Sequence, residues 1–107
     1  MSEKETQLAQ QLFEKTNARA IAWQPTARSN EFLAPFRGDV TFTIGRYANQ
    51  YDNEYYKLMM RDQDGRELLE LDTPDKLLGD LYKAAHDAAL NVEETIDSVL
   101  DELRKVS

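Results

Sequence analysis

Apolar side chains recur at helical spacing near the N-terminus of the chain. Leu8, Leu12 and Phe13 share one face, and charged or amide side chains fill the opposite face. This pattern predicts one amphipathic helix over residues 3–17, with Ser2 as its N-cap.

Two further helices are predicted in the C-terminal third of the chain. Thr73 and Pro74 have the residue types of an N-cap and a first helical position, and a wide apolar stripe follows them to about Leu90. Asn91, with Glu94 three residues later, is typical of a second N-cap. The apolar positions of the last helix are Val92, Ile96, Val99, Leu100 and Leu103. Because so short a helix is marginally stable alone in water, we expect this stripe to pack on the preceding helix or on a second subunit.

Between the helices the apolar residues alternate with polar ones, as they do in strands. The alternation predicts three strands, at 40–44, 55–61 and 66–71, with one or two more before them at 20–23 and 32–36. Residues 45–53 are expected to form a polar loop, and Asp62–Gly65 has the residues of a tight hairpin turn.

The order of these elements predicts a single α+β domain spanning residues 1–107. An N-terminal helix, an antiparallel β-meander of three to five strands and two C-terminal helices make up this fold, with the helices packed on one face of the sheet. The other face of the sheet is expected to present Thr41, Thr43, Tyr55, Lys57, Met59 and Arg61.

Composition and charge narrow the classes of partner. The 107 residues include 20 acidic and 13 basic side chains, for a net charge of −7, and no cysteine. This charge disfavours electrostatic binding to nucleic acid or to an anionic membrane. No apolar run is long enough for a transmembrane helix and the first 20 residues do not resemble a signal peptide, so we expect a cytoplasmic protein.

Residue types that carry chemistry are present but do not form motifs. His86 is the only histidine, and without cysteine it cannot complete the usual zinc shell. Asp62-x-Asp64-Gly65 resembles the start of a calcium loop, but the position that should hold glutamate is Leu71. Residues 72–107 carry nine acidic and four basic side chains, which argues against a DNA-binding helix-turn-helix. The sequence therefore predicts no enzyme, no catalytic residue, no cofactor and no metal site.

Aromatic residues are concentrated around the predicted sheet and its long loop. They either fill the core and its rim or form an interaction surface, because tyrosine and tryptophan are enriched at interface hot spots. The candidate residues of this surface are Trp23, Tyr47, Tyr51, Tyr55 and Tyr56.

A set of spaced residues through most of the chain carries a resemblance to other proteins. These residues are Phe13, Thr16, Ile21, Trp23, Thr26, Tyr56, Leu58, Asp64, Gly65, Leu81, Tyr82, Ala85, Ala88, Val92, Ile96, Asp97, Leu100, Glu102 and Leu103. Together they resemble a family of small uncharacterised bacterial proteins of the accessory gene pool, including mobile cassettes. The family has no assigned activity, so the resemblance implies only the fold order and a bacterial cytoplasmic setting.

Three hypotheses about function follow from these patterns. The first is a non-enzymatic protein-interaction module that self-associates, as a homodimer, or binds another protein. The second is an acidic decoy or immunity-type protein that binds a basic partner. The third is a small-molecule binder that uses an aromatic-lined crevice between sheet and helices near Trp23 and Tyr56.

Overall fold

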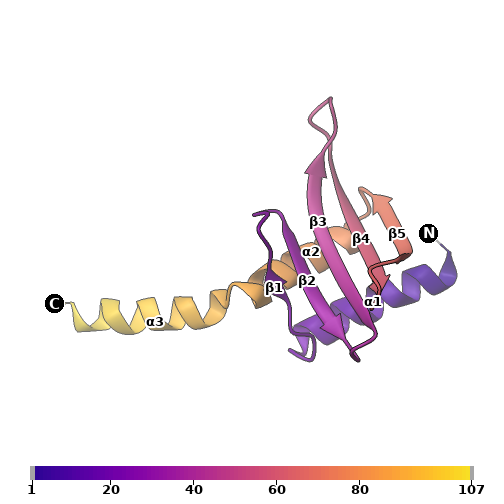
Figure 1. The fold of residues 1–107 in the computed structure, drawn as a ribbon. Coiled ribbons are helices and arrows are strands. Elements are labelled where there is room, and N and C mark those ends of the chain that lie inside the picture. The colour runs from indigo at the N-terminus through magenta and orange to yellow at the C-terminus, as the bar shows by residue number, and fades with distance from the viewer. Residues whose placement is uncertain (1, 107) are drawn as a thin grey trace.

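The computed structural model describes residues 2–106, and it has the predicted α+β architecture (Figure 1). Five strands form one antiparallel sheet in chain order, which confirms the meander. The elements are α1 (Glu3–Asn17), β1 (Gln24–Pro25), β2 (Glu31–Phe36), β3 (Val40–Ala48), β4 (Glu54–Asp62), β5 (Glu67–Thr73), α2 (Lys76–Ala89) and α3 (Val92–Lys105).

Helices α1 and α2 lie side by side on one face of the sheet and enclose the core with it (Figure 1). Alternate strand residues point to this face because successive side chains of a strand point in opposite directions. The buried apolar side chains of the core are Ala9, Leu12, Ile21, Trp23, Phe32, Ala34, Phe42, Ile44, Leu58, Leu71, Leu78, Leu81, Tyr82 and Ala85.

The start of α1 follows the sequence prediction closely. The Ser2 hydroxyl accepts a hydrogen bond from the Glu5 backbone N–H at 3.2 Å, and the Glu5 carboxylate accepts one from the Ser2 backbone N–H at 2.8 Å. This reciprocal pair is a capping box, which satisfies N–H groups that an unprotected helix terminus leaves free.

Other element boundaries differ from the prediction. Residues 45–48, expected in a loop, continue β3, and the first strand is Gln24–Pro25 rather than residues 20–23. Thr73 is not the N-cap of α2, because its backbone pairs with Tyr56 at the end of β5. Asp75 caps the helix instead and accepts a hydrogen bond from the Leu77 N–H at 2.7 Å.

The last helix, α3, does not pack on the sheet, and this part of the prediction is wrong. It projects away from the body of the molecule (Figure 1), and none of its residues is buried. The long axis of the molecule is accordingly 54 Å, against 38 and 27 Å for the other two.

The break between α2 and α3 lies at Asn91. Its φ of 51° and ψ of 46° are left-handed, a conformation that asparagine tolerates better than most residues. The Asn91 side chain makes no capping hydrogen bond, so the predicted capping box is absent. Beyond this residue, α3 extends away from the end of α2 instead of folding back along it (Figure 1).

Candidate interaction site

Trp23, the only tryptophan, lies in the core rather than on a surface. Its side chain is 5% exposed, and its indole N–H donates a hydrogen bond of 2.8 Å to the Thr16 hydroxyl. That hydroxyl donates in turn to the Leu12 carbonyl of α1 at 2.6 Å. Trp23 therefore ties the segment after α1 to the helix itself.

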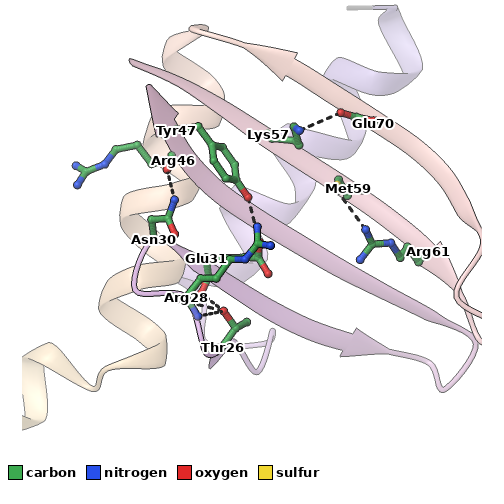
Figure 2. Close-up of polar contacts among 10 residues, drawn as sticks. All are labelled: Thr26, Arg28, Asn30, Glu31, Arg46, Tyr47, Lys57, Met59, Arg61 and Glu70. Carbon is green, nitrogen blue, oxygen red and sulfur yellow. Dashed lines mark hydrogen bonds and ion pairs between the residues drawn. The ribbon is translucent and has the colours of Figure 1, made fainter. Parts of the chain in front are cut away.

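Tyr47 lies on the face of the sheet that no helix covers (Figure 2), and Tyr55 is its partner on the neighbouring strand β4. Their rings stack with centroids 5.7 Å apart, and the Lys57 ammonium lies 5.4 Å from the Tyr47 ring centroid. The Tyr47 hydroxyl donates a hydrogen bond of 3.0 Å to the Glu31 carboxylate. This contact is possible because Tyr47 lies across Gly45, where a Cβ would come within 2.6 Å of the tyrosine oxygen.

The ionisable side chains near Tyr47 on this open face interact with one another, and these contacts shift their pKa values. Burial and the Glu31 carboxylate raise the pKa of Tyr47. Lys57 and Glu70 form an ion pair at 3.3 Å, which raises the pKa of Lys57. Hydrogen bonds from Glu67 and Lys57 lower the pKa of Glu70. Around Tyr47, the side chains of Glu31, Lys57 and Glu70 thus already have partners within the chain.

Tyr51 and Tyr56 lie apart from this stack. Tyr51 is exposed in the loop between β3 and β4. Tyr56 points to the helix-covered face, where its ring meets Gly79 of α2, and it borders a cavity of about 560 Å³. The five candidate aromatic residues therefore do not form one continuous surface: the fold brings only Tyr47 and Tyr55 together.

Among residues 2–106, several large exposed apolar side chains follow one another along α3. They belong to a row, here called the α3 stripe, that consists of Val92, Ile96, Val99, Leu100 and Leu103 on the helix and Val106 directly after it. Without Leu100, they follow one another at alternating intervals of four and three residues, which is the seam of a two-helix coiled coil. Ile96, Val99, Leu100 and Leu103 are between 42% and 61% exposed. An exposed apolar stripe of this kind is therefore a candidate interaction site.

A groove lies at the base of α3, with a volume of about 420 Å³. Segments from the end of α1, the connection to β1, the end of α2 and the start of α3 line it. Its apolar lining comes from Ile21, Ala22, Trp23, Ala88 and Val92, and its charged residues are Arg19, Asp87, Glu93 and Glu94. Val92 belongs both to this base groove and to the α3 stripe, so the two apolar surfaces are continuous.

An ion pair connects the two sides of the base groove. The Arg19 guanidinium, from the segment after α1, donates to the Glu93 carboxylate in the first turn of α3. Exposed pairs of this kind contribute at most about 1 kcal/mol to stability. The contact nevertheless gives α3 a second point of attachment beyond its covalent link to α2.

Acidic side chains occur along the whole length of α3, whereas its two basic side chains lie in the last turn. Glu93 and Glu94 lie in the first turn, and Arg104 and Lys105 lie in the last. This distribution suits the helix dipole. Arg104 pairs with Asp101 at 3.0 Å and Lys105 with Glu102 at 3.7 Å, so the basic charges are matched within the helix.

Comparison of the chain with protein-family models, with curated proteins and with solved structures finds no match. Within residues 2–106, no helix combines the length and apolar character needed to cross a membrane. The same residues contain no group of three or more histidine, cysteine, aspartate or glutamate side chains placed to hold a metal ion. The resemblance to small bacterial proteins stays a prediction.

Sequence reasoning found the α3 stripe but missed the base groove. The groove consists of small or isolated residues from four segments, such as Ala22 and Ala88, and none of them carries a periodic signal. Two alanines in the second half of α2, Ala84 and Ala88, line the groove, and small side chains of this kind allow another segment to approach closely.

Proposed function

We propose that the chain is a non-enzymatic protein-interaction module that self-associates as a dimer through α3. The observation that carries this proposal is the α3 stripe, which lies exposed on a helix that projects from an otherwise closed body. Removing apolar surface from water contributes roughly 25 cal/mol per Å², so a partner that covers the stripe stabilises both helices. The proposal keeps the cytoplasmic setting expected from the sequence.

A second copy of the chain suits the stripe because two helices with the same alternating spacing of four and three residues can pack along one seam. In an antiparallel pair, the two helix dipoles oppose each other. A parallel pair would place the two acidic first turns together. Charge therefore favours the antiparallel arrangement, in spite of the net charge of −7 on each chain.

Light scattering coupled to size-exclusion chromatography tests self-association directly. We expect a monomer–dimer equilibrium whose dimer fraction rises with protein concentration. Val99→Asp places a carboxylate in the stripe and should abolish the dimer, because a buried unpaired charge is costly. Ser98→Asp adds the same charge one residue away on the opposite face of α3 and should leave the dimer intact. A strict monomer up to high micromolar concentration contradicts the proposal.

A second candidate function rests on the cavity beside Tyr56. Arg46, Lys76 and Lys83 line it, and within residues 2–106 none of these three cations has a carboxylate within 4.0 Å. The Arg46 guanidinium carbon lies 5.5 Å from the Tyr82 ring centroid. The acidic lining residues are Asp80 and Asp87. Cations next to aromatic rings suit a small organic anion with a flat apolar group.

Titration with benzoate and with phenyl phosphate, followed by nuclear magnetic resonance, tests this second candidate. We expect saturable shifts confined to residues around the cavity, and we expect Lys83→Gln to weaken them. Lys4→Gln, on α1, removes the same charge away from the cavity and serves as the control. Shifts that do not saturate, or that survive Lys83→Gln unchanged, contradict small-molecule binding at this cavity.

The acidic polar face of α3 supports the alternative of a basic partner. The last two helices with their flanking residues 72–107 carry a net charge of −5. Such a partner should be captured from a lysate at low salt and released at high salt, because salt screens exposed charges. This capture should survive Val99→Asp, because the substitution leaves the polar face of α3 intact. The variant therefore distinguishes binding of a basic partner from self-association.

A further inference from the structure

We propose that protonation of His86 controls how tightly the cavity beside Tyr56 binds an anion, with Asp87 as the carboxylate that favours the protonated ring. The proposal rests on the second candidate function, the binding of a small organic anion at this cavity, and adds its regulation by pH. His86 lines the cavity, and it is the only histidine of the chain.

The contacts of His86 hold its ring at the wall of the cavity. The imidazole meets the Phe32 ring edge-on, with centroids 5.5 Å apart, and its centroid lies 6.3 Å from that of the Tyr82 ring. The side chain is 40% exposed. A proton can therefore reach the imidazole from solvent while the ring keeps its place beside the cavity.

Asp87 stands next to the imidazole. The Nδ1 atom of His86 lies 3.0 Å from a carboxylate oxygen of Asp87. An opposite charge this close stabilises an imidazolium, so Asp87 favours the protonated form of His86. On its other side Asp87 borders the base groove, where the cation Arg19 is paired with Glu93.

Cations outnumber carboxylates among the other ionisable side chains around His86. β1 consists of Gln24 and Pro25, which carry no charge, and the β2 residue that meets the His86 ring is Phe32. Within residues 2–106, the lining of the cavity holds three cations and two carboxylates, so its formal charge is +1 with a neutral His86 and +2 with a protonated one. The ionisable lining residues besides His86 are Lys76, Asp80, Tyr82, Lys83 and Asp87 on α2, Arg46 on β3 and Tyr56 on β4.

Protonation of His86 and binding of an anion should favour each other. The cations Arg46 and Lys83 repel an imidazolium, and an anion bound at them reduces this repulsion. The imidazolium in turn attracts the anion. Because such coupling is reciprocal, the affinity for an anion should rise as the pH falls and His86 takes up a proton.

The composition of the chain makes such a pH effect easy to assign. Histidine is the side chain that ordinarily titrates between about pH 5 and 8, and the chain has one histidine and no cysteine. A change of affinity over this range, for a ligand of constant charge, therefore comes from His86 or from the N-terminal amino group.

Titration with benzoate at several pH values, followed by nuclear magnetic resonance, tests the proposal. Benzoate stays a monoanion over the range in which histidine titrates. We expect its affinity to rise about fivefold between about pH 8 and pH 5.5, the lower end of the usual coupling between two sites. His86→Gln should bind benzoate with one affinity throughout, whereas Lys4→Gln, on α1, should keep the pH dependence of the unmodified chain.

A second pair of variants tests the role of Asp87. Without the carboxylate beside the imidazole, the imidazolium is less stable, so Asp87→Asn should move the rise in affinity to lower pH. Asp80→Asn removes the same charge from the same helix and the same cavity, but the contact between Asp87 and His86 remains. It should therefore move the rise less, and equal shifts in the two variants would overturn the role of Asp87.

Proton uptake gives a readout that needs no variant to fold. Calorimetry of benzoate binding in buffers of different ionisation enthalpy counts the protons that the unmodified chain takes up. We expect uptake of a fraction of a proton at about pH 6.5, where histidine ordinarily titrates. Binding without proton uptake contradicts the proposal.

The possible results separate the proposal from the second candidate function. Saturable binding of benzoate that does not vary with pH overturns the proposal and leaves anion binding at the cavity standing. A pH dependence that survives His86→Gln also overturns the proposal alone, because it then belongs to another group. Absence of saturable binding at every pH overturns both.

Discussion

Gly65 holds a left-handed conformation in the turn between β4 and β5. Its φ is +83°, its N–H donates 3.0 Å to the Asp62 carbonyl, and a Cβ at this position would meet nothing within 4 Å. A side chain here is therefore penalised by backbone strain and not by a clash. We expect Gly65→Val to lower the free energy of unfolding by about 1–3 kcal/mol.

Chemical denaturation measures this cost, and Gly65→Asn is the matched control. Asparagine tolerates a positive φ, so it should cost less than valine at the same position. If the two variants and the parent share one midpoint, strain at Gly65 does not contribute to stability.

The capping box at Ser2 and Glu5 predicts a pH effect. The pKa of Glu5 is lowered by hydrogen bonds that its carboxylate accepts from Ser2. The larger effect comes from the Ser2 backbone N–H and the smaller one from the Ser2 hydroxyl. The group stabilises the fold at pH above the ordinary pKa of glutamate, and this contribution is lost as the pH falls through the lowered value. Ser2→Ala should raise the pKa of Glu5 toward its ordinary value in a nuclear magnetic resonance titration. Ser2→Thr keeps a hydroxyl and should not, and an unchanged pKa in Ser2→Ala would show that the hydroxyl has no part in the shift.

Single residues also show where local signals succeed and where they fail. Ser2 and Gly65 act through neighbours within three residues, so their roles could be predicted from the sequence. Thr73 has equally good capping chemistry, but pairing with Tyr56 on the neighbouring strand keeps it in β5. A contact with a distant segment decided the position of this boundary.

At the scale of elements, the alternating pattern predicted the order of the strands but not their full length. β3 continues to Ala48 through Gly45 and Arg46, residues that the sequence suggests for a loop. Residues 45–48 stay in the strand because they pair with residues 54–57 of β4. Gly45 also leaves room for the ring of Tyr47, and this fit is visible only once the side chains of the open face are placed.

The central strands and α3 should respond differently to the same substitution. Leu58 is fully buried in β4, so Leu58→Ala should cost about 2–5 kcal/mol at every protein concentration. Leu100 is 42% exposed in one copy, so Leu100→Ala should destabilise the protein only where the dimer forms. Denaturation at low and high protein concentration measures both effects. A cost for Leu100→Ala that does not vary with concentration would show that Leu100 is covered within one chain.

At the scale of the whole molecule, the sequence indicates that α3 needs a partner but not what covers it. Amphipathic spacing is a property of one helix, and it predicts an apolar face without naming its neighbour. α3 begins after the left-handed Asn91, and the Arg19–Glu93 ion pair links its first turn to the segment after α1. Asparagine at this position is compatible with a helix N-cap and also with a left-handed residue that breaks the helix. The sequence alone therefore does not distinguish these two structures.

The separation of α3 from the core predicts that the rest of the chain folds without it. The core draws its buried residues from α1, the segment that follows it, the sheet and α2, and none of them lies in α3. A chain that ends at Asn91 should therefore remain a folded monomer, with a thermal midpoint that does not vary with concentration. The midpoint of the full chain should rise with concentration, because dimer formation stabilises the folded state by mass action.

Differential scanning calorimetry at several concentrations compares the two chains. At low concentration, where the full chain is a monomer, the two midpoints should agree, since α3 adds no buried surface to the core. A shortened chain that fails to fold would show that α3 supports the body directly. A concentration dependence that persists without α3 would place the dimer contact elsewhere, and the uncovered face of the sheet would then be the surface to test.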